Sequence, residues 1–282
     1  MLLDQLELIL PGRRMEQAFD VAQMPDAMGG SQLAGGFHID RGMFGSQLVE
    51  AHAVLGICAM SDWDWPLAER KYQEALRINP NYATARHWHA ILLLYQCRYD
   101  ESLAEIRLAH SLDPLSGVIQ CLTGFILHLA GRDDEGLAEI DKALKFYPDF
   151  PLGHLNRGDI FSAQKKFPEA IAEYEIVRQH AGDSFYGLSG LGYAYARAGR
   201  TNEARQILEQ LKNFSTSGSS VFGDISLVYE GLGDLDNAFI WLDRAAQARE
   251  VDPRALKSEP LSADLAKDPR YAALLKKYGL DK

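Results

Sequence analysis

Residues 66–80 read PLAERKYQEALRINP, and this stretch decides the fold. It opens with Pro66, which the first turn of a helix tolerates, and it closes with Pro80, where a helix cannot continue. Tyr72 and Ala75 are three residues apart, so they share one face of the helix between the prolines. Ala68 is small enough to let a second helix approach closely. The stretch predicts one short helix that packs against an antiparallel neighbour.

The same pattern returns at a fixed interval along the chain. The dipeptides that end at Pro80, Pro114 and Pro148 are separated by steps of 34 residues. Four further columns keep this step across six units: Gly56, Ala90, Gly124, Gly158, Gly192 and Ser226; Ala68, Ser102, Gly136, Ala170, Ala204 and Ala238; Tyr72, Ile106, Ile140, Tyr174, Leu208 and Leu242; and Ala75, Ala109, Ala143, Val177, Leu211 and Ala245. Gly131, Gly199 and Gly233 fit the left-handed position that ends a helix. A fixed period of this length indicates stacked helix pairs.

This 34-residue unit resembles the tetratricopeptide repeat, most clearly in PLAERKYQEALRINP, FPEAIAEYE (167–175) and LGYAYARAGRTNEA (191–204). The resemblance covers residues 49–252 as six repeats. It implies an all-α fold, an α-solenoid of antiparallel helix pairs wound as a right-handed superhelix. The family's usual Trp in the first helix is replaced by His52, Arg86, Gln120, His154, Leu188 and Phe222. The Ser/Gly-rich stretch NFSTSGSS (213–220) predicts that the fifth repeat ends early, at a looser joint.

Two flanking segments surround the repeats. Within residues 253–282, the stretch DPRYAALLKKYG (268–279) predicts a C-terminal capping helix, with Asp268 as its cap and Gly279 as its terminator. Residues 1–48 are glycine-rich and poorly patterned, which indicates short helices or a partly ordered linker. The alternative is that this N-terminal segment folds back and plugs the concave groove of the repeats.

Composition limits the partners and the location. The 282 residues carry a formal net charge of −10, so nucleic-acid binding as the main activity is disfavoured. The three cysteines (Cys58, Cys97 and Cys121) show no CxxC spacing, which suits a reducing compartment. The sequence contains no long uninterrupted apolar run and no basic start of a signal peptide. We therefore expect a cytoplasmic protein that does not associate with membranes.

The resemblance to the repeat family places part of each first helix on the concave surface. Across the second and third repeats these positions are aromatic and apolar, and across the fourth and fifth they become polar and tyrosine-rich. Only Asn156 and Arg197 resemble the Lys, Asn and Arg clamp with which chaperone-binding members hold a terminal carboxylate. This composition favours a peptide held by a few aromatic anchors. The predicted groove residues are His87, Trp88, Ile91, Tyr95, Cys121, Phe125, His128, Asn156, Asp159, Tyr186, Tyr193 and Arg197. For Trp88 and Phe125, simple packing between neighbouring helices is the alternative.

The stretch RHWHA (86–90) invites a metal hypothesis, which helical geometry disfavours. His87 and His89 are two residues apart, so on a helix their rings diverge by about 160°. We expect His87 to face the groove and His89 to pack between helices. The sequence contains no GxSxG or HExxH motif, and Cys121 and His128 would lie roughly 10 Å apart along one helix. We predict no catalytic activity, no cofactor and no metal.

Three functional hypotheses remain. The leading one is a scaffold that binds a partner protein or peptide, with self-association through exposed helix faces as an additional expectation. The second is a regulatory module of a bacterial signalling protein, because residues 61–90 and DPRYAALLKKYGL (268–280) resemble the repeat tails of such regulators. Its effector domain would be missing from this chain. The third is a small-molecule site near His87, Trp88 and His128.

Overall fold

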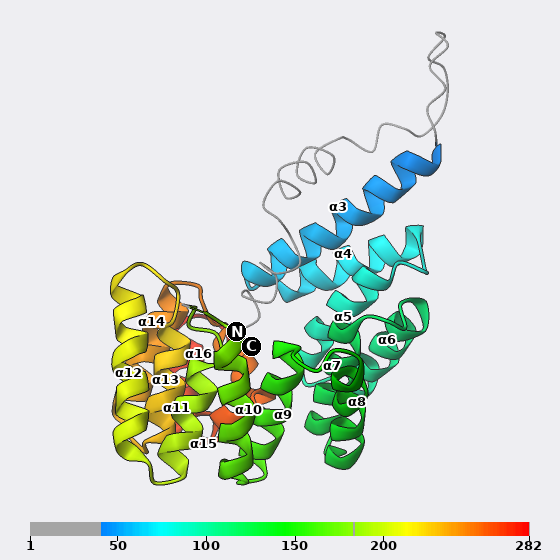
Figure 1. The fold of residues 1–282 in the computed structure, drawn as a ribbon. Coiled ribbons are helices and arrows are strands. Elements are labelled where there is room, and N and C mark those ends of the chain that lie inside the picture. Colours follow the sequence, from blue (N-terminus) through cyan, green and yellow to red (C-terminus); the bar gives the residue numbers. More distant parts are fainter. Residues whose placement is uncertain (1–40, 183, 282) are drawn as a thin grey trace. The chain divides into compact units, whose positions relative to one another are not determined.

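The computed structural model describes residues 41–182 and 184–281, and every regular element within them is a helix (Figure 1). The chain forms two compact units. The N-terminal unit comprises the described residues up to Leu92 together with Ala104–Asp113. The C-terminal unit comprises Leu93–Leu103 and the chain from Pro114 onward. We describe each unit by itself.

The helices alternate as the first and second member of each repeat. The first helices are α3 (Arg41–Ser61), α5 (Ala83–Tyr95), α7 (Gly117–Leu129), α9 (Pro151–Ala163), α11 (Leu188–Arg197) and α13 (Phe222–Gly231). The second helices are α4 (Trp65–Ile78), α6 (Tyr99–Leu112), α8 (Asp133–Phe146), α10 (Phe167–His180), α12 (Thr201–Thr216) and α14 (Leu235–Gln247). The predicted all-α fold of antiparallel helix pairs is confirmed.

In the N-terminal unit, α3 packs on α4 through a glycine and a tyrosine. The Tyr72 side chain is fully buried, and a Cβ added at Gly56 would lie 2.4 Å from its ring. The ring of His89 also lies against Tyr72, at 5.9 Å between centroids. The small and large columns of the sequence therefore correspond to facing positions on paired helices. The same pairing recurs between Gly158 and the buried Tyr174 in the C-terminal unit.

One predicted boundary at the N-terminus is wrong. Residues 41–48, which the sequence assigns to an N-terminal segment of short helices or partly ordered linker outside the repeats, are the first turns of α3. The prediction for residues 1–40, including their role as a groove plug, lies outside the described residues.

The turn inside each repeat contains one residue in the left-handed conformation. Gly131, Gly199 and Gly233 have φ of 76°, 78° and 75°, as the sequence predicts. In the other three repeats the same position holds Trp63, Cys97 and Lys165, with φ of 64°, 58° and 61°. The backbone bonds of a closed helix end follow: Gly131 N donates to His128 O and Arg132 N to Leu127 O, at 2.8 and 2.9 Å. The turn therefore keeps its left-handed conformation in all six repeats, including the three in which the residue is not glycine.

The predicted early end of the fifth repeat is wrong. Helix α12 continues through residues 213–216, because Phe214 packs edge-on against Phe185 at 5.8 Å between ring centroids. After the turn, α13 begins at Phe222. Its first amides donate to the carboxylate of Glu250, at 3.0 Å from Phe222 N and 2.7 Å from Gly223 N. Tertiary contacts therefore override the weak helix propensity of the Ser/Gly-rich stretch.

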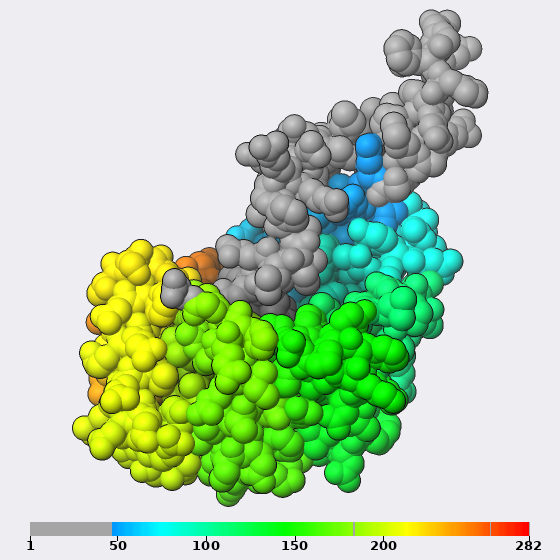
Figure 2. Space-filling view, in the orientation of Figure 1, coloured from blue at the N-terminus to red at the C-terminus, as the bar shows by residue number. Residues whose placement is uncertain are grey.

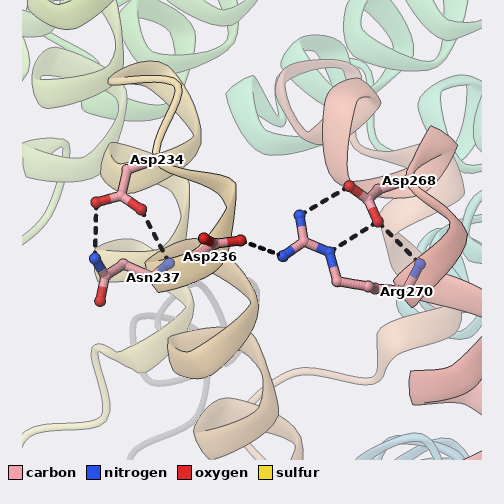
Figure 3. Close-up of polar contacts among 5 residues, drawn as sticks. All are labelled: Asp234, Asp236, Asn237, Asp268 and Arg270. Carbon is pink, nitrogen blue, oxygen red and sulfur yellow. Dashed lines mark hydrogen bonds and ion pairs between the residues drawn. The ribbon is translucent and has the colours of Figure 1, made fainter.

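The chain beyond α14 forms four short elements. They are the 3₁₀ helices η1 (Pro253–Ser258) and η2 (Pro260–Ser262), then α15 (Ala263–Lys267) and α16 (Pro269–Lys277). The Asp268 side chain caps α16 by accepting from Arg270 N at 2.9 Å, and the Arg270 guanidinium reaches Asp236 at the start of α14 at 2.6 Å (Figure 3). Tyr271 and Leu274 are buried against the apolar face of α14. Helix α16 is thus fixed to the last repeat by apolar and charged contacts.

None of the described helices has both the length and the apolar composition that crossing a membrane requires.

Candidate functional site

A segment of the chain lies across the first helices of the C-terminal unit. We call residues 253–267, which contain η1, η2 and α15, the strap. Helix η2 contacts both α9 and α13, two first helices that belong to different repeats. On the side of the unit shown in Figure 2, only small orange parts of the C-terminal residues are visible beside the green and yellow helices. We call the surface of α9, α11 and α13 beneath the strap the strap site.

The firmest polar contact of the strap is made by Glu230 of α13. This side chain is 1% exposed, and its Oε1 accepts from the backbone amides of Asp264 and Leu265 at 2.9 and 3.0 Å. Those amides belong to the first turn of α15, where helix amides lack partners within the helix. Burial raises the pKa of Glu230 to about 7, against the opposing effect of the two amides. Glu230 therefore acts as a cap supplied by another helix.

Arg197 and Tyr193 of α11 form a second contact region. The Arg197 guanidinium lies 3.4 Å from the Asp264 carboxylate and 5.8 Å from the centroid of the Tyr193 ring. Arg197 is partly open to solvent, so this ion pair is weak, whereas Tyr193 is buried. Both residues were predicted for the groove, and both lie beside the strap.

Leucines supply the apolar part of the strap. Leu256, Leu261 and Leu265 are 4%, 7% and 2% exposed. Leu256 and Leu265 join the apolar cluster of α14 and α16. Leu261 belongs to η2, the element that contacts α9 and α13. The strap is therefore held by burial at both of its ends and in its middle.

Two predicted groove residues of α9 make hydrogen bonds within the C-terminal unit. Asp159 accepts from the hydroxyl of Tyr174 at 2.7 Å, and burial raises its pKa to about 7. The Asn156 side-chain amide donates to the Cys121 carbonyl at 3.2 Å, which joins α9 to α7. Both side chains are buried, so a partner would reach them only after a movement of the chain that covers them.

The other predicted residues of the C-terminal unit differ in exposure. Cys121 is fully buried beside Ala143 and Leu152, and burial raises its pKa to about 12. Phe125, Tyr186 and Tyr95 are half-buried. Burial, followed by the carboxylates of Glu259 and Asp252, raises the pKa of Tyr95 well above its usual range, which places Tyr95 near the strap. The half-buried side chain of His128 faces the Asp133 carboxylate at 2.8 Å through Nδ1.

The three predicted residues of the N-terminal unit are buried. His87, Trp88 and Ile91 are 7%, 3% and 5% exposed. Burial lowers the pKa of His87 to about 4, so the ring is neutral at physiological pH. His89 lies against Tyr72, which agrees with a packing role. Within residues 41–182 and 184–281, no cluster of three or more His, Cys, Asp or Glu side chains is placed to hold a metal ion.

Sequence reasoning missed the polar pairs that replace the family's usual Trp. His154 Nδ1 faces the Glu173 carboxylate at 2.7 Å, and its Nε2 faces the Pro148 carbonyl at 2.7 Å. Arg86 pairs with Glu105 at 2.7 Å in the same way. The signal was present, because Glu105 and Glu173 are also two periods of 34 residues apart. Sequence reasoning also missed the strap, for which the only signal was the single charge of Glu230 inside the otherwise uncharged SLVYEGL (226–232).

These observations define a helical-repeat protein in which the first helices α9, α11 and α13 contact the strap. Residues 155–218 match the tetratricopeptide repeat family. PilW, a widely conserved type IV pilus biogenesis factor, has a similar structure at 21% identity and a TM-score of 0.54, over 78% of this chain and 99% of that chain. PilF of Pseudomonas aeruginosa is similar at 17% identity and a TM-score of 0.51, over 75% and 96%. A tetratricopeptide repeat protein of Thermus thermophilus is similar at 18% identity and a TM-score of 0.53, over 70% and 99%.

Likeness at this level of identity establishes the fold. No curated protein matches this sequence significantly. A tetratricopeptide repeat region is a protein–protein interaction domain, and the comparisons identify no partner for it.

Proposed function

We propose that this chain is a non-catalytic scaffold that binds a peptide segment of a partner protein on the first helices of its repeats. The observation that carries the proposal is the strap, because α9, α11 and α13 already hold a peptide segment there, one of the chain's own. Its contacts are a carboxylate on backbone amides, an ion pair and buried leucines. These are general means of peptide recognition.

Two half-buried aromatic residues of the C-terminal unit supply the remaining anchors. Phe125 of α7 and Tyr186, which directly precedes α11, each keep part of the ring accessible. Aromatic side chains contribute large contact area at little conformational cost, which suits them to hold a partner. We also propose a cytoplasmic location, which the three free cysteines favour.

Site-specific photo-crosslinking in cells of the native host tests the scaffold. A photoreactive phenylalanine derivative replaces Phe125 or Tyr186, and the matched control replaces Lys142, which is exposed on the second helix α8. We expect the same partner to crosslink from Phe125 and Tyr186 and not from Lys142. Adducts from Lys142 alone, or no adducts from any position in correctly folded protein, would overturn the proposal.

The narrower alternative is that the scaffold serves a bacterial signalling or transcription-regulatory system. It is supported by the resemblance of residues 61–90 and 268–280 to the repeat tails of such regulators. Sequencing the coding region upstream of this chain tests the alternative. An in-frame effector domain would support it, and an unrelated upstream gene would count against it.

A further inference from the structure

We propose that the strap is an intramolecular ligand, which a partner segment of the same chemistry displaces from the strap site. This inference rests on the proposed function and names the kind of partner that it involves. That partner segment forms a short helical turn with unpaired amides at its start, an acidic residue in that turn, and leucines four residues apart. The strap itself has these features in PLSADLA (260–266).

The first argument is the way in which α15 is capped. Ser262 stands at the N-cap position, where a serine hydroxyl normally accepts from a backbone amide of the first turn. Here the Ser262 side chain makes no such bond, and Glu230 of α13 takes its place. The start of α15 is therefore completed by the strap site and not by the strap's own sequence. This is the relationship of a ligand to its receptor.

The second argument is the low intrinsic stability of the strap. It consists of two 3₁₀ helices and one helix of 5 residues, and helices this short are not stable alone in water. The strap is consequently ordered only while it is bound. Its polar contacts with α11 and α13 are few, one carboxylate on two amides and one ion pair at 3.4 Å, and the buried Leu261 belongs to η2, which contacts α9 and α13. Such a set of contacts is compatible with opening.

The third argument is that both ends of the strap are attached to elements outside the strap site. At its C-terminal end, α16 is fixed to α14 by Arg270–Asp236 and by Lys277–Asp243. At its N-terminal end, the strap continues directly from the last repeat. When the strap opens, Leu256 and Leu265 leave the apolar cluster of α14 and α16, and the two ion pairs together with buried Tyr271 and Leu274 keep α16 on α14. A tethered segment also acts at an effective concentration of roughly millimolar, so it competes strongly with any free peptide.

The test uses a fluorescent peptide of residues 252–268, DPRALKSEPLSADLAKD, titrated into full-length protein. The strap variant combines Leu261→Ser with Asp264→Ala, which removes contacts from the strap and leaves the strap site intact. We expect it to bind the peptide at least tenfold more tightly than the wild-type chain, because its own strap competes less. Hydrogen exchange should quicken in residues 253–267 and stay slow in α14 and α16.

Adding Glu230→Ala to the strap variant alters the strap site itself. We expect this triple variant to lose the gained peptide binding, and Glu230→Gln in the same background to restore part of it, since Gln keeps a carbonyl acceptor. A control peptide with Leu261→Ser should bind weakly to every variant.

Two results would overturn the proposal. One is a strap variant with fast exchange in residues 253–267 and no gain in peptide binding. The other is a strap variant in which exchange in these residues remains slow, which would make the strap a permanent part of the fold. Neither result depends on the crosslinking at Phe125 and Tyr186. A failure of this inference is therefore distinguishable from a failure of the proposed function.

Discussion

The left-handed residue of each repeat turn gives a direct test of how the period controls stability. Lys165 has a φ of 61° at a position where three other repeats have glycine. It is exposed, and its amide donates to Ser162 O at 2.9 Å, a bond that glycine would keep. Replacing Lys165 with glycine should therefore change little except the backbone strain at this one residue.

The expected size follows from two opposing effects. A left-handed conformation costs a residue with a Cβ about 1–2 kcal/mol, and glycine escapes this penalty. Glycine in turn lowers the free energy of unfolding by about 0.5–1 kcal/mol, because it gives the unfolded chain more conformational freedom. Lys165→Gly should therefore stabilise the repeat by about 0.5–1 kcal/mol. The matched control is Gly131→Ala, which should destabilise the protein by about 1 kcal/mol, although a Cβ there meets no atom within 4 Å.

Urea unfolding followed by circular dichroism measures both changes as shifts of the midpoint. Because repeat arrays can open locally, hydrogen exchange in α9 and α10 should accompany the unfolding curve. Lys165→Gly should slow exchange in these two helices. The reasoning would be refuted if Lys165→Gly lowered the midpoint while Gly131→Ala left it unchanged.

Three further predictions concern packing, capping and pH. Gly56→Ala should destabilise the protein by about 1–3 kcal/mol, because the new methyl group would lie 2.4 Å from the buried Tyr72 ring. A thermal midpoint equal to that of the wild type would contradict this prediction. Glu250→Ala should lower the free energy of unfolding by about 1–2 kcal/mol and speed amide hydrogen exchange at the start of α13, because two amides and the Ser220 hydroxyl lose their acceptor. Unchanged hydrogen exchange there would count against the capping role of Glu250. The pKa of Asp159 is about 7 in the folded protein, above its ordinary value of 3.8, so the stability that it contributes is present below pH 3.8 and is lost as the pH rises through 7. Asp159→Asn should therefore gain stability relative to the wild type as the pH rises from about 4 to about 7 in urea unfolding, with a constant difference at higher pH, and a pH-independent difference over the whole range would disprove the assignment.

The repeated part of this fold could be predicted from the sequence because each column has a simple physical cause. Gly56 is small because Tyr72 is large, and Gly131 is a glycine because its φ is positive. These causes act within one repeat, so they recur along the chain, although Trp63, Cys97 and Lys165 take the left-handed position in three repeats. The end of α12 could not be predicted in this way. Its stability depends on Phe214 meeting Phe185, a contact between residues with no fixed spacing.

The candidate site was harder to predict, because its occupant lies outside the period. Position within a repeat predicted that Tyr193 and Arg197 line the groove, yet it gave no means of recognising the strap, which lies beside both residues. The strap is short and aperiodic, and its decisive contact joins Glu230 to amides of Asp264 and Leu265 more than 30 residues later. A backbone amide carries no sequence signal. Only the charge of Glu230 on an otherwise uncharged part of α13 marked the place.

The departures from the family pattern show how the scaffold keeps its geometry while its chemistry changes. At the usual Trp position, Arg86 and His154 each reach a glutamate on the second helix of the same repeat. Both ring nitrogens of His154 face oxygen atoms, Nδ1 the Glu173 carboxylate and Nε2 the Pro148 carbonyl. Such pairs fix how two helices pack, and they add less stability than apolar contacts would. The usual Trp position of the repeat therefore tolerates a polar pair in place of an apolar contact. Glu230 has no equivalent pair inside its own repeat, and its partner is the strap. The buried Glu230 carboxyl has its hydrogen-bond donors in the strap, outside the repeats, and this distinguishes its contact from the helix-packing pairs of Arg86 and His154.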